Sequence, residues 1–184
     1  MTSPHAARWA WFLVALAVVA LDRITKMMVE AWLPPYRSVP VVPGLVDLTF
    51  VQNPGGVFGV FRSLDASWRA GLFTVVPMAA ILLILAYAWR VPAEHRLTLA
   101  SLALILGGAV GNLVDRFRLG YVVDFLDVHW RGWHWPAFNV ADSTICIGVG
   151  LLLVESLFSP QRSGATTPGP SGAPSPEAAR RDLP

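Results

Sequence analysis

Two long runs without a charged residue constrain this chain more than any other feature. Residues 70–89 and 97–114 are twenty and eighteen residues long and contain no Asp, Glu, Lys or Arg. A helix needs roughly 20 apolar residues to cross the hydrocarbon core of a bilayer. Because a short charged segment, residues 90–96, separates the two runs, they read as consecutive spans joined by a tight loop. The chain is therefore predicted to be a helical membrane protein.

The composition of the 184 residues supports this class. Hydrophobic residues make up 54% and charged residues 14%, whereas an ordinary soluble domain has about 25% charged residues. The mean hydropathy of +0.53 excludes a disordered body, because such a chain has ample apolar surface to bury. A single cysteine, Cys146, excludes an internal disulfide and a four-thiolate metal site.

Two further spans are predicted from less uniform segments. The first covers residues 9–32, although Asp22, Arg23 and Lys26 follow its thirteen leading apolar residues. Residues 9–21 could instead be the apolar core of a cleavable signal peptide, but no small-x-small cleavage site follows them. The last span covers residues 136–158 and contains Asp142. The chain is thus expected to have four transmembrane helices.

The segments outside the spans differ from them in composition. Residues 33–69 carry short β-branched and aromatic runs, at 39–42 and 45–52, separated by prolines and Gly44. This pattern predicts a small β-rich cap lying on the membrane surface. Residues 160–184 are mainly Pro, Ser, Gly, Ala and Thr, which is typical of a disordered tail. We expect a four-span domain over residues 1–159 followed by this tail.

The charges give only a weak signal about orientation. An even number of spans places both termini on one side, and the arginines divide six against six between the two sides. Two of them lie in the short loop 90–96, where the positive-inside rule is strongest, and this favours cytoplasmic termini.

Polar residues near the ends of the spans are the functional candidates, because a charge in the membrane is costly and persists mainly when it has a use. Asp22 and Lys26 are four residues apart, so they can pair on one helix face; either anchoring of the cap or contact with substrate would explain them. The run Asn53-Pro54-Gly55 is continued by glycines at 56 and 59. It could supply the side-chain amide of Asn53 and a backbone that allows close approach, or it could be a plain turn.

The third span ends in a second polar group. The glycines at 107, 108 and 111 should let helices pack closely. Asn112, Asp115 and Arg116 follow with a spacing that places them on one helix face.

Two aspartates lie in the apolar segments that follow. Asp124 interrupts the apolar run 120–126, and Asp142 stands three residues after Asn139, on the same helix face. Pro136 suits a helix start. Either aspartate alone could be a capping or structural carboxylate, but two at the same end of adjacent elements are harder to explain in that way.

Two nearby carboxylates suit amide hydrolysis. They cannot both ionise easily, so one holds a proton while the other acts as a base on a water molecule. The chain offers few other sources of chemistry. Ser143 and Thr144 have no obvious histidine partner, and Cys146 is predicted to lie deep in an apolar span.

The loop before the last span contains histidines and tryptophans. His129 and His134 with Asp127 could be imagined as a metal site, but their spacing matches no metalloprotease helix motif. Trp130, Trp133 and Trp135 are more simply interpreted as an interfacial aromatic belt.

Taken together, these motifs resemble the lipoprotein signal peptidase family, also called signal peptidase II. The resemblance covers about residues 9–158 and rests on three segments in the family's order and spacing: Asn53-Pro-Gly-Gly-Val-Phe-Gly59, Gly111-Asn-Leu-Val-Asp-Arg116 with Gly120-Tyr-Val-Val-Asp-Phe125, and Phe138-Asn-Val-Ala-Asp142. It implies four spans with cytoplasmic termini in the bacterial inner membrane. It also implies an active site near the outer face that cleaves prolipoproteins just before a diacylglyceryl-modified cysteine.

The resemblance also implies roles for individual residues. Asp124 and Asp142 match the catalytic dyad, while Asp22 and Lys26 match positions we interpret as structural. Asp115 is expected to be structural too, with Arg116 and Arg118 as its partners. Relatives often have two alanines at the positions of Gly56 and Val57. The positions that match polar residues binding the substrate are Asn53, Asn112, Arg116 and Asn139.

The expected partners are diacylglyceryl-modified prolipoproteins and membrane lipid. No metal, cofactor or nucleic acid is expected. The glycines of residues 55–59 are predicted to let the cap open and close over the site.

Two other classes of protein are alternatives. A carrier or channel could use Asp124, Asp142 and Asn112 as an ion path, but it should spread polar groups through the bilayer, whereas the second and third spans are apolar until Asn112. A structural scaffold would not explain why two aspartates lie in these apolar segments.

Overall fold

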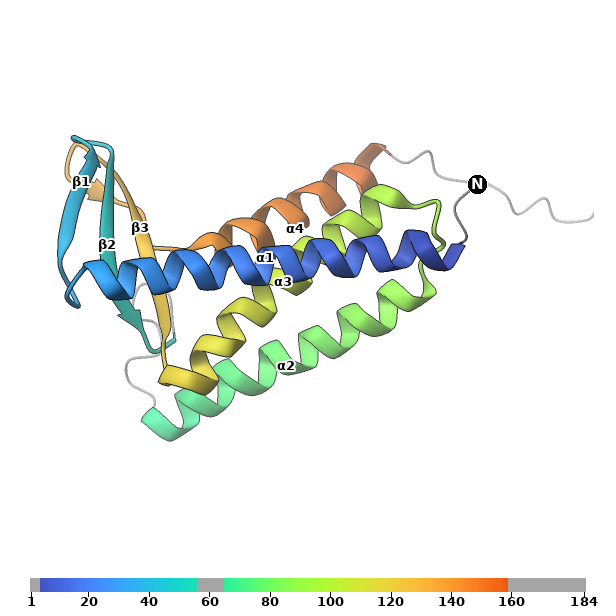
Figure 1. The fold of residues 1–184 in the computed structure, drawn as a ribbon, viewed down its shortest axis with the longest axis horizontal. Coiled ribbons are helices and arrows are strands. Elements are labelled where there is room, and N and C mark those ends of the chain that lie inside the picture. Colours follow the sequence, from blue (N-terminus) through green and yellow to red (C-terminus); the bar gives the residue numbers. More distant parts are fainter. Residues whose placement is uncertain (1–3, 56–64, 159–184) are drawn as a thin grey trace, which may run out of the picture.

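The computed structural model describes residues 4–55 and 65–158. Within these ranges the chain forms four helices and a small sheet that lies across one end of them (Figure 1). The helices are α1 (Pro4–Trp32), α2 (Ala66–Arg90), α3 (Arg96–Leu119) and α4 (Val140–Phe158). The strands are β1 (Ser38–Val42), β2 (Val46–Asn53), β3 (Val122–Trp130) and β4 (Trp133–His134).

Three of the described helices, α2, α3 and α4, are long and apolar enough to cross a membrane. They coincide with three of the predicted spans. Helix α1 covers the first predicted span as one continuous helix but, with its cluster of charges, is not among the three. Helix α4 begins at Val140 and not at Pro136 as predicted, because the side chain of Asn139 caps it by accepting a hydrogen bond from the Asp142 backbone N–H.

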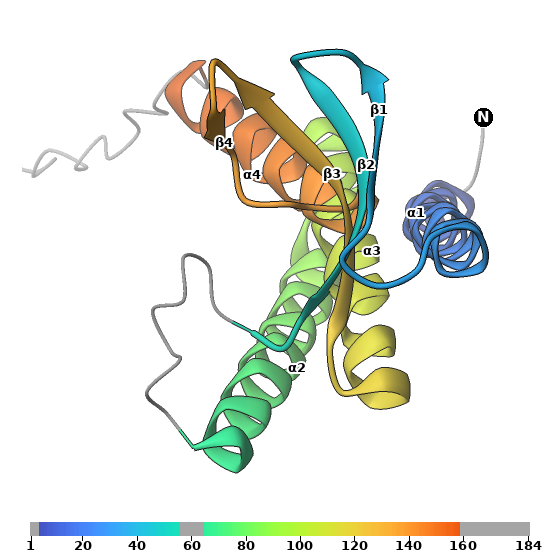
Figure 2. The same ribbon diagram turned by 90° about the vertical axis from the view of Figure 1, so that its left-hand side faces the viewer.

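The sheet combines two distant parts of the sequence. Its strand order is β1-β2-β3-β4, and the pairs are antiparallel. Strands β1 and β2 confirm the predicted runs 39–42 and 45–52. Strand β3, which was not predicted, runs beside β2 after the chain returns from α3 (Figure 2). The cap is therefore built from both loops on this side of the helices.

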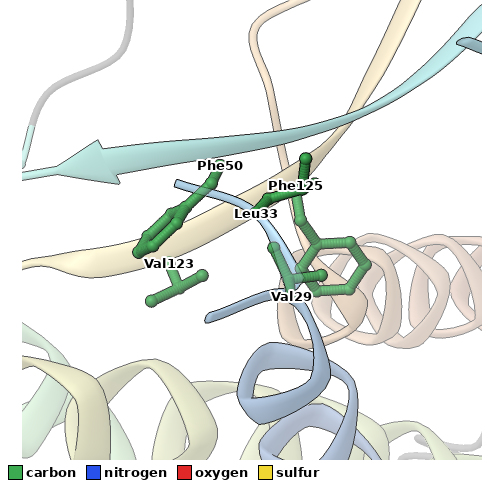
Figure 3. Close-up of a cluster of buried hydrophobic side chains, with 5 residues drawn as sticks. All are labelled: Val29, Leu33, Phe50, Val123 and Phe125. Carbon is green, nitrogen blue, oxygen red and sulfur yellow. The ribbon is translucent and has the colours of Figure 1, made fainter. Parts of the chain in front are cut away.

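A small hydrophobic core fixes the sheet to the end of α1. Val29 and Leu33 at the end of α1 pack with Phe50 of β2 and with Val123 and Phe125 of β3, and all five side chains are buried (Figure 3). Because Val123 and Phe125 point to this core, the side chain of Asp124 between them points to the opposite face of the sheet.

Glycines allow α3 to approach its neighbours closely, as predicted. A Cβ atom added at Gly107 would lie 2.7 Å from the Ala15 carbonyl oxygen of α1, and one at Gly108 would lie 2.8 Å from Thr144 Oγ1 of α4. The same holds in the other direction for Gly148 of α4, whose added Cβ would lie 2.7 Å from the Ser101 carbonyl oxygen of α3.

Gly148→Ala is expected to destabilise the protein by about 1–3 kcal/mol, because the backbone of Ser101 cannot move away without separating α3 from α4. Gly150→Ala is the matched control on the same helix, since nothing lies within 4 Å of its added Cβ. Thermal unfolding in detergent would measure both. Equal transition temperatures for the two variants would show that α3 and α4 are not packed this closely.

Two predictions fall outside the described residues. One is the tail of residues 160–184, and the other is the cap movement assigned to residues 55–59, of which only Gly55 is described.

Candidate active site

Asp124 and Asp142 reach the same region from different elements. Asp124 is the third residue of β3, and Asp142 is the third residue of α4. Asn139 and Asp142 cap the helix reciprocally: the Asp142 N–H donates to Asn139 Oδ1 at 3.0 Å, and the Asn139 N–H donates to Asp142 Oδ2 at 3.2 Å. The capping alternative considered for Asp142 is thus part of its geometry, and it fixes where the carboxylate stands.

Three asparagines hold the two carboxylates. Asn53 Nδ2 donates to Asp124 Oδ2 at 2.8 Å, and Asn139 Nδ2 donates to Asp124 Oδ1 at 2.7 Å. Asn112 Nδ2 donates to Asp142 Oδ1 at 2.7 Å. The structure therefore brings together five of the six residues predicted for the site, from β2, β3, α3 and the start of α4.

The turn at Asn53 also has a local role. The Gly55 N–H donates to Asn53 Oδ1 at 3.0 Å, and Gly55 has a φ of +111°, which favours glycine. The plain-turn and functional interpretations of this motif both hold, because the side-chain carbonyl forms the turn while the amide nitrogen binds Asp124.

Both aspartates line one cavity of about 560 Å³. Asn53, Asp124 and Asp142 form its polar part. The rest of the lining comes from the segment before α4 and from the first two turns of α4: Trp135, Pro136, Ala137, Phe138, Ser143, Cys146 and Ile147.

Cys146 lies within the apolar helix α4, the predicted span, and it also takes part in the site. Its side chain is exposed and lines this cavity, because it stands one helical turn after Asp142 on the same helix face.

The environment of Asp124 favours a proton on its carboxyl group. Its side chain is almost fully buried, with 2% of the residue exposed. The pKa of Asp124 is raised to about 7, chiefly by burial and next by the neighbouring charge of Asp142, against the opposing effect of hydrogen bonds from Asn53 and Asn139. One member of the pair can therefore hold a proton near neutral pH.

A buried ion network lies behind the two aspartates. Lys26, with no exposed surface, lies 2.8 Å from Asp22 Oδ2 and 2.9 Å from Asp115 Oδ2, and it donates to Asn112 Oδ1 at 2.9 Å. The predicted pair of Asp22 and Lys26 is confirmed. Arg23 adds a further ion pair with Asp115.

The network is joined directly to the elements that carry the dyad. Asp22 Oδ1 accepts the N–H of Ala141, next to Asp142, at 2.9 Å. Asp115 Oδ2 accepts the N–H of Val123, next to Asp124, at 3.2 Å. Asp22 and Asp115 are fully buried, so both position the dyad from behind rather than facing the cavity.

The predicted partners of Asp115 were wrong. Among the described residues its ion pairs are with Arg23 and Lys26 of α1 and not with Arg116 and Arg118 of its own helix. Asp115 stands on the face of α3 that meets α1, whereas Arg118 is exposed.

Arg116 is the predicted site residue that no hydrogen bond among the described residues joins to the dyad, although its charge interacts with those of Asp142 and Asp124. Its guanidinium carbon lies 5.7 Å from the centroid of the Phe73 ring of α2, and its Nε is buried without a hydrogen-bond partner in the described part of the chain. The structure gives it no hydrogen bond to either aspartate, so its role in binding substrate stays a prediction.

The histidine-containing loop forms the end of the sheet. His134 Nδ1 lies 3.0 Å from both carboxylate oxygens of Asp127, and His129 Nε2 lies 3.2 Å from Asp47 Oδ1. Within the described residues no group of three or more His, Cys, Asp or Glu side chains is arranged to hold a metal ion.

Helices able to span a membrane carry at one end two aspartates that asparagines hold beside a cavity, and this combination indicates a membrane-embedded enzyme. The comparisons with known proteins name the family. The family model described as signal peptidase (SPase) II matches residues 14–158. The chain belongs to this family, and it is a peptidase that removes signal peptides from prolipoproteins.

Individual relatives agree over most of the chain. It is 43% identical to the lipoprotein signal peptidase of Geobacter metallireducens over 82% of this chain and 91% of that protein. It is 44% identical to that of Syntrophotalea carbinolica over 77% of this chain and 87% of that protein. The resemblance inferred from the motifs is confirmed, and the carrier and scaffold alternatives are set aside.

Solved structures show the same fold. A bacterial membrane enzyme structure obtained by the in meso method at 2.3 Å resolution matches with a TM-score of 0.74 and 26% identity, over 85% of this chain and 92% of that one. A second such structure, at 1.9 Å resolution, matches with a TM-score of 0.71 and 27% identity, over 82% and 94%.

Proposed function

We propose that this chain hydrolyses the peptide bond before the diacylglyceryl-modified cysteine of prolipoproteins by means of Asp124 and Asp142. The observation that carries the proposal is that both carboxylates line one cavity while amide groups of Asn53, Asn112 and Asn139 hold them in place. No other pair of acidic side chains lines this cavity in the described residues.

The mechanism follows from one proton shared by two carboxyl groups. The ionised aspartate accepts a proton from a water molecule as its oxygen attacks the scissile carbonyl carbon. The protonated aspartate donates its proton to the carbonyl oxygen, which gives a tetrahedral intermediate with two hydroxyl groups. This intermediate collapses as the C–N bond breaks: the amine takes the proton that came from water, and one hydroxyl group returns its proton to the other aspartate. We assign the resting proton to Asp124, whose pKa of about 7 exceeds that of an ordinary aspartate.

We further propose that α1 is the fourth span. Its charges at Asp22, Arg23 and Lys26 are paired within the protein, which removes the main cost of placing them in a bilayer. Leu13, Leu16 and Ile24 are exposed on its outer surface, as lipid-facing side chains would be. With four spans both termini lie on one side, and the arginines of the loop 90–96 support the cytoplasm for that side.

This arrangement puts the sheet and the dyad near the extracytoplasmic face of the bacterial inner membrane. The modified cysteine would then approach from the bilayer, its acyl chains remaining in lipid while the scissile bond enters the cavity beside α4. The lining residues Cys146 and Ile147 support this route, because they extend the wall of the cavity along α4.

The proposal is tested by incubating purified protein in detergent with two matched peptides, one carrying a diacylglyceryl-modified cysteine and the other a free cysteine. Cleavage of the modified peptide, directly before the cysteine and unaffected by a chelator, is expected. Equal cleavage of the two peptides, or loss of cleavage with the chelator, would contradict the proposal.

Activity is expected to fall as the pH rises above about 7. The raised pKa of Asp124 means that its proton is present below this value and is lost above it. Without that proton the pair has no acid, so kcat/KM should fall about ten-fold per pH unit on the alkaline side. Initial rates measured between pH 5 and pH 9 would show this fall, the alkaline limb of the pH profile.

Asn53→Ala tests independently whether Asp124 is the group whose deprotonation lowers the activity. Because the amide of Asn53 stabilises the ionised form of Asp124, its removal should move the alkaline limb to higher pH. A limb that moves to lower pH would show that a group other than Asp124 supplies the acid.

A further inference from the structure

The segment between the two aspartates forms a hairpin whose base is closed. The backbone of Phe138 pairs with Leu126 in both directions, with N···O distances of 3.0 and 2.8 Å, and its carbonyl oxygen also accepts the N–H of Phe125 at 3.0 Å. Phe138 directly precedes Asn139, and Leu126 lies two residues after Asp124. These bonds close the base of the hairpin of residues 127–137 beside both aspartates.

One face of the hairpin carries two imidazole–carboxylate pairs. His129 and His134 are opposite each other in the β3–β4 register, and their rings stack with centroids 4.7 Å apart. Asp127 and Asp47 are opposite each other in the β2–β3 register. Because each histidine also contacts one of these aspartates, the four side chains tie β4 to β3 and β3 to β2.

The other face of the hairpin carries the aromatic side chains. Side chains alternate along a strand, so Trp133 and Trp135 point away from the face of His134. Trp135 packs edge-on against Trp133, with ring centroids 5.8 Å apart, and together with Pro136 and Ala137 it lines the cavity that contains the dyad.

The cavity therefore has two walls with different surroundings. Ser143, Cys146 and Ile147 form a wall along α4, which continues into the membrane. The hairpin wall of Trp135 to Ala137 lies between β4 and α4, outside that helix. A prolipoprotein has two lipophilic parts, the signal peptide before the cleaved bond and the diacylglyceryl group, and both belong beside the α4 wall. The hairpin wall can then contact the remaining part of the substrate, the residues that follow the cysteine.

We propose that Trp135 contacts the residues that follow the modified cysteine and so sets specificity for them, and that the His134–Asp127 pair is a positioning element that holds Trp135 in place. This inference rests on the proposed function of the same cavity. It predicts effects on the binding of that part of the substrate alone, because both aspartates are held by asparagines and neither His134 nor Trp135 is among these partners.

The test compares two lipopeptides that share a signal segment and a diacylglyceryl-modified cysteine. One ends at the cysteine as an amide, and the other continues for four more residues. His134→Ala should raise KM for the longer peptide about two- to five-fold, the range for loss of an exposed ion pair. It should leave kcat, and both constants for the short peptide, unchanged. Trp135→Ala should produce a larger rise in KM with the same selectivity.

Three controls separate positioning from simple loss of structure. His134→Asn should restore KM, because its Nδ2 can take the place of the His134 Nδ1 that contacts Asp127. His134→Ala should have no further effect when Asp127→Ala is already present, because the pair is then already lost. His95→Ala removes a matched exposed histidine at the start of α3, at the opposite end of the helices, and should change nothing.

Equal effects of His134→Ala on the two peptides, or a fall in kcat, would overturn the inference. A non-cleavable analogue of the longer peptide, with a reduced scissile bond, gives a second readout through its affinity for the wild type and for Trp135→Ala. If wild type cleaves neither peptide, the proposed function fails. If it cleaves both and the variants bind the longer analogue as tightly as wild type does, only the hairpin inference fails.

Discussion

Asp124→Asn and Asp142→Asn are each expected to lower kcat by about a thousand-fold or more while the protein remains folded. An amide can neither accept a proton from water nor return one to the leaving amine, and general acid–base catalysis by one group contributes up to about 10⁴-fold. The fold should tolerate both changes, because asparagine has the shape of aspartate and its carbonyl oxygen can still accept one of the two hydrogen bonds that each carboxylate receives.

The measurement is single-turnover cleavage of the diacylglyceryl-modified peptide, with thermal unfolding recorded for each variant. Asp65→Asn is the matched control, since Asp65 is exposed and its side chain makes no capping bond to α2. This control should cleave at the wild-type rate. If a folded dyad variant keeps more than a tenth of the wild-type rate, that carboxylate does not belong to the reaction.

Lys26→Met is expected to destabilise the protein by about 3–5 kcal/mol. Methionine fills the space of the aliphatic chain but leaves Asp22 and Asp115 buried without the charge between them, and breaking a buried pair by removing one partner has a cost of this size. Activity should fall as well, because Asn112 loses a donor that fixes its side chain toward Asp142.

Thermal unfolding in detergent measures this effect, with Arg118→Met as a matched loss of one exposed positive charge near the end of α3. The control should change stability by less than about 0.5 kcal/mol. Adding Asp22→Asn to Lys26→Met should recover part of the loss, because it removes one of the unpaired charges. A Lys26→Met protein as stable as the control would show that the network does not hold the helices together.

The parts of the site that were predictable from sequence depend on local geometry. The spacing of Asp22 and Lys26 places them on one helix face whatever surrounds the helix, and the structure confirms their pairing. Asn139 and Asp142 were placed together by the same reasoning. The reciprocal cap they form was available from the sequence, since Asn and Asp at this spacing precede an apolar run.

The parts that were missed depend on contacts between distant segments. The partner of Asp115 is Arg23, 92 positions earlier, and no periodicity within α3 could have shown it. Strand β3 was missed for a related reason. Its first residues are buried on both faces, by α1 on one side and by the site on the other, so the alternation typical of a half-exposed strand is absent.

The side chain of Asn139 joins Asp124 of β3 to the first turn of α4, and this has a consequence for biosynthesis. Helix α4 is the last of the described helices to be made, so a nascent chain that has inserted α1 to α3 has Asp124 but lacks its partner and the amide that orients it. Under the proposed mechanism, hydrolytic competence then arises in one step, when α4 docks against α3.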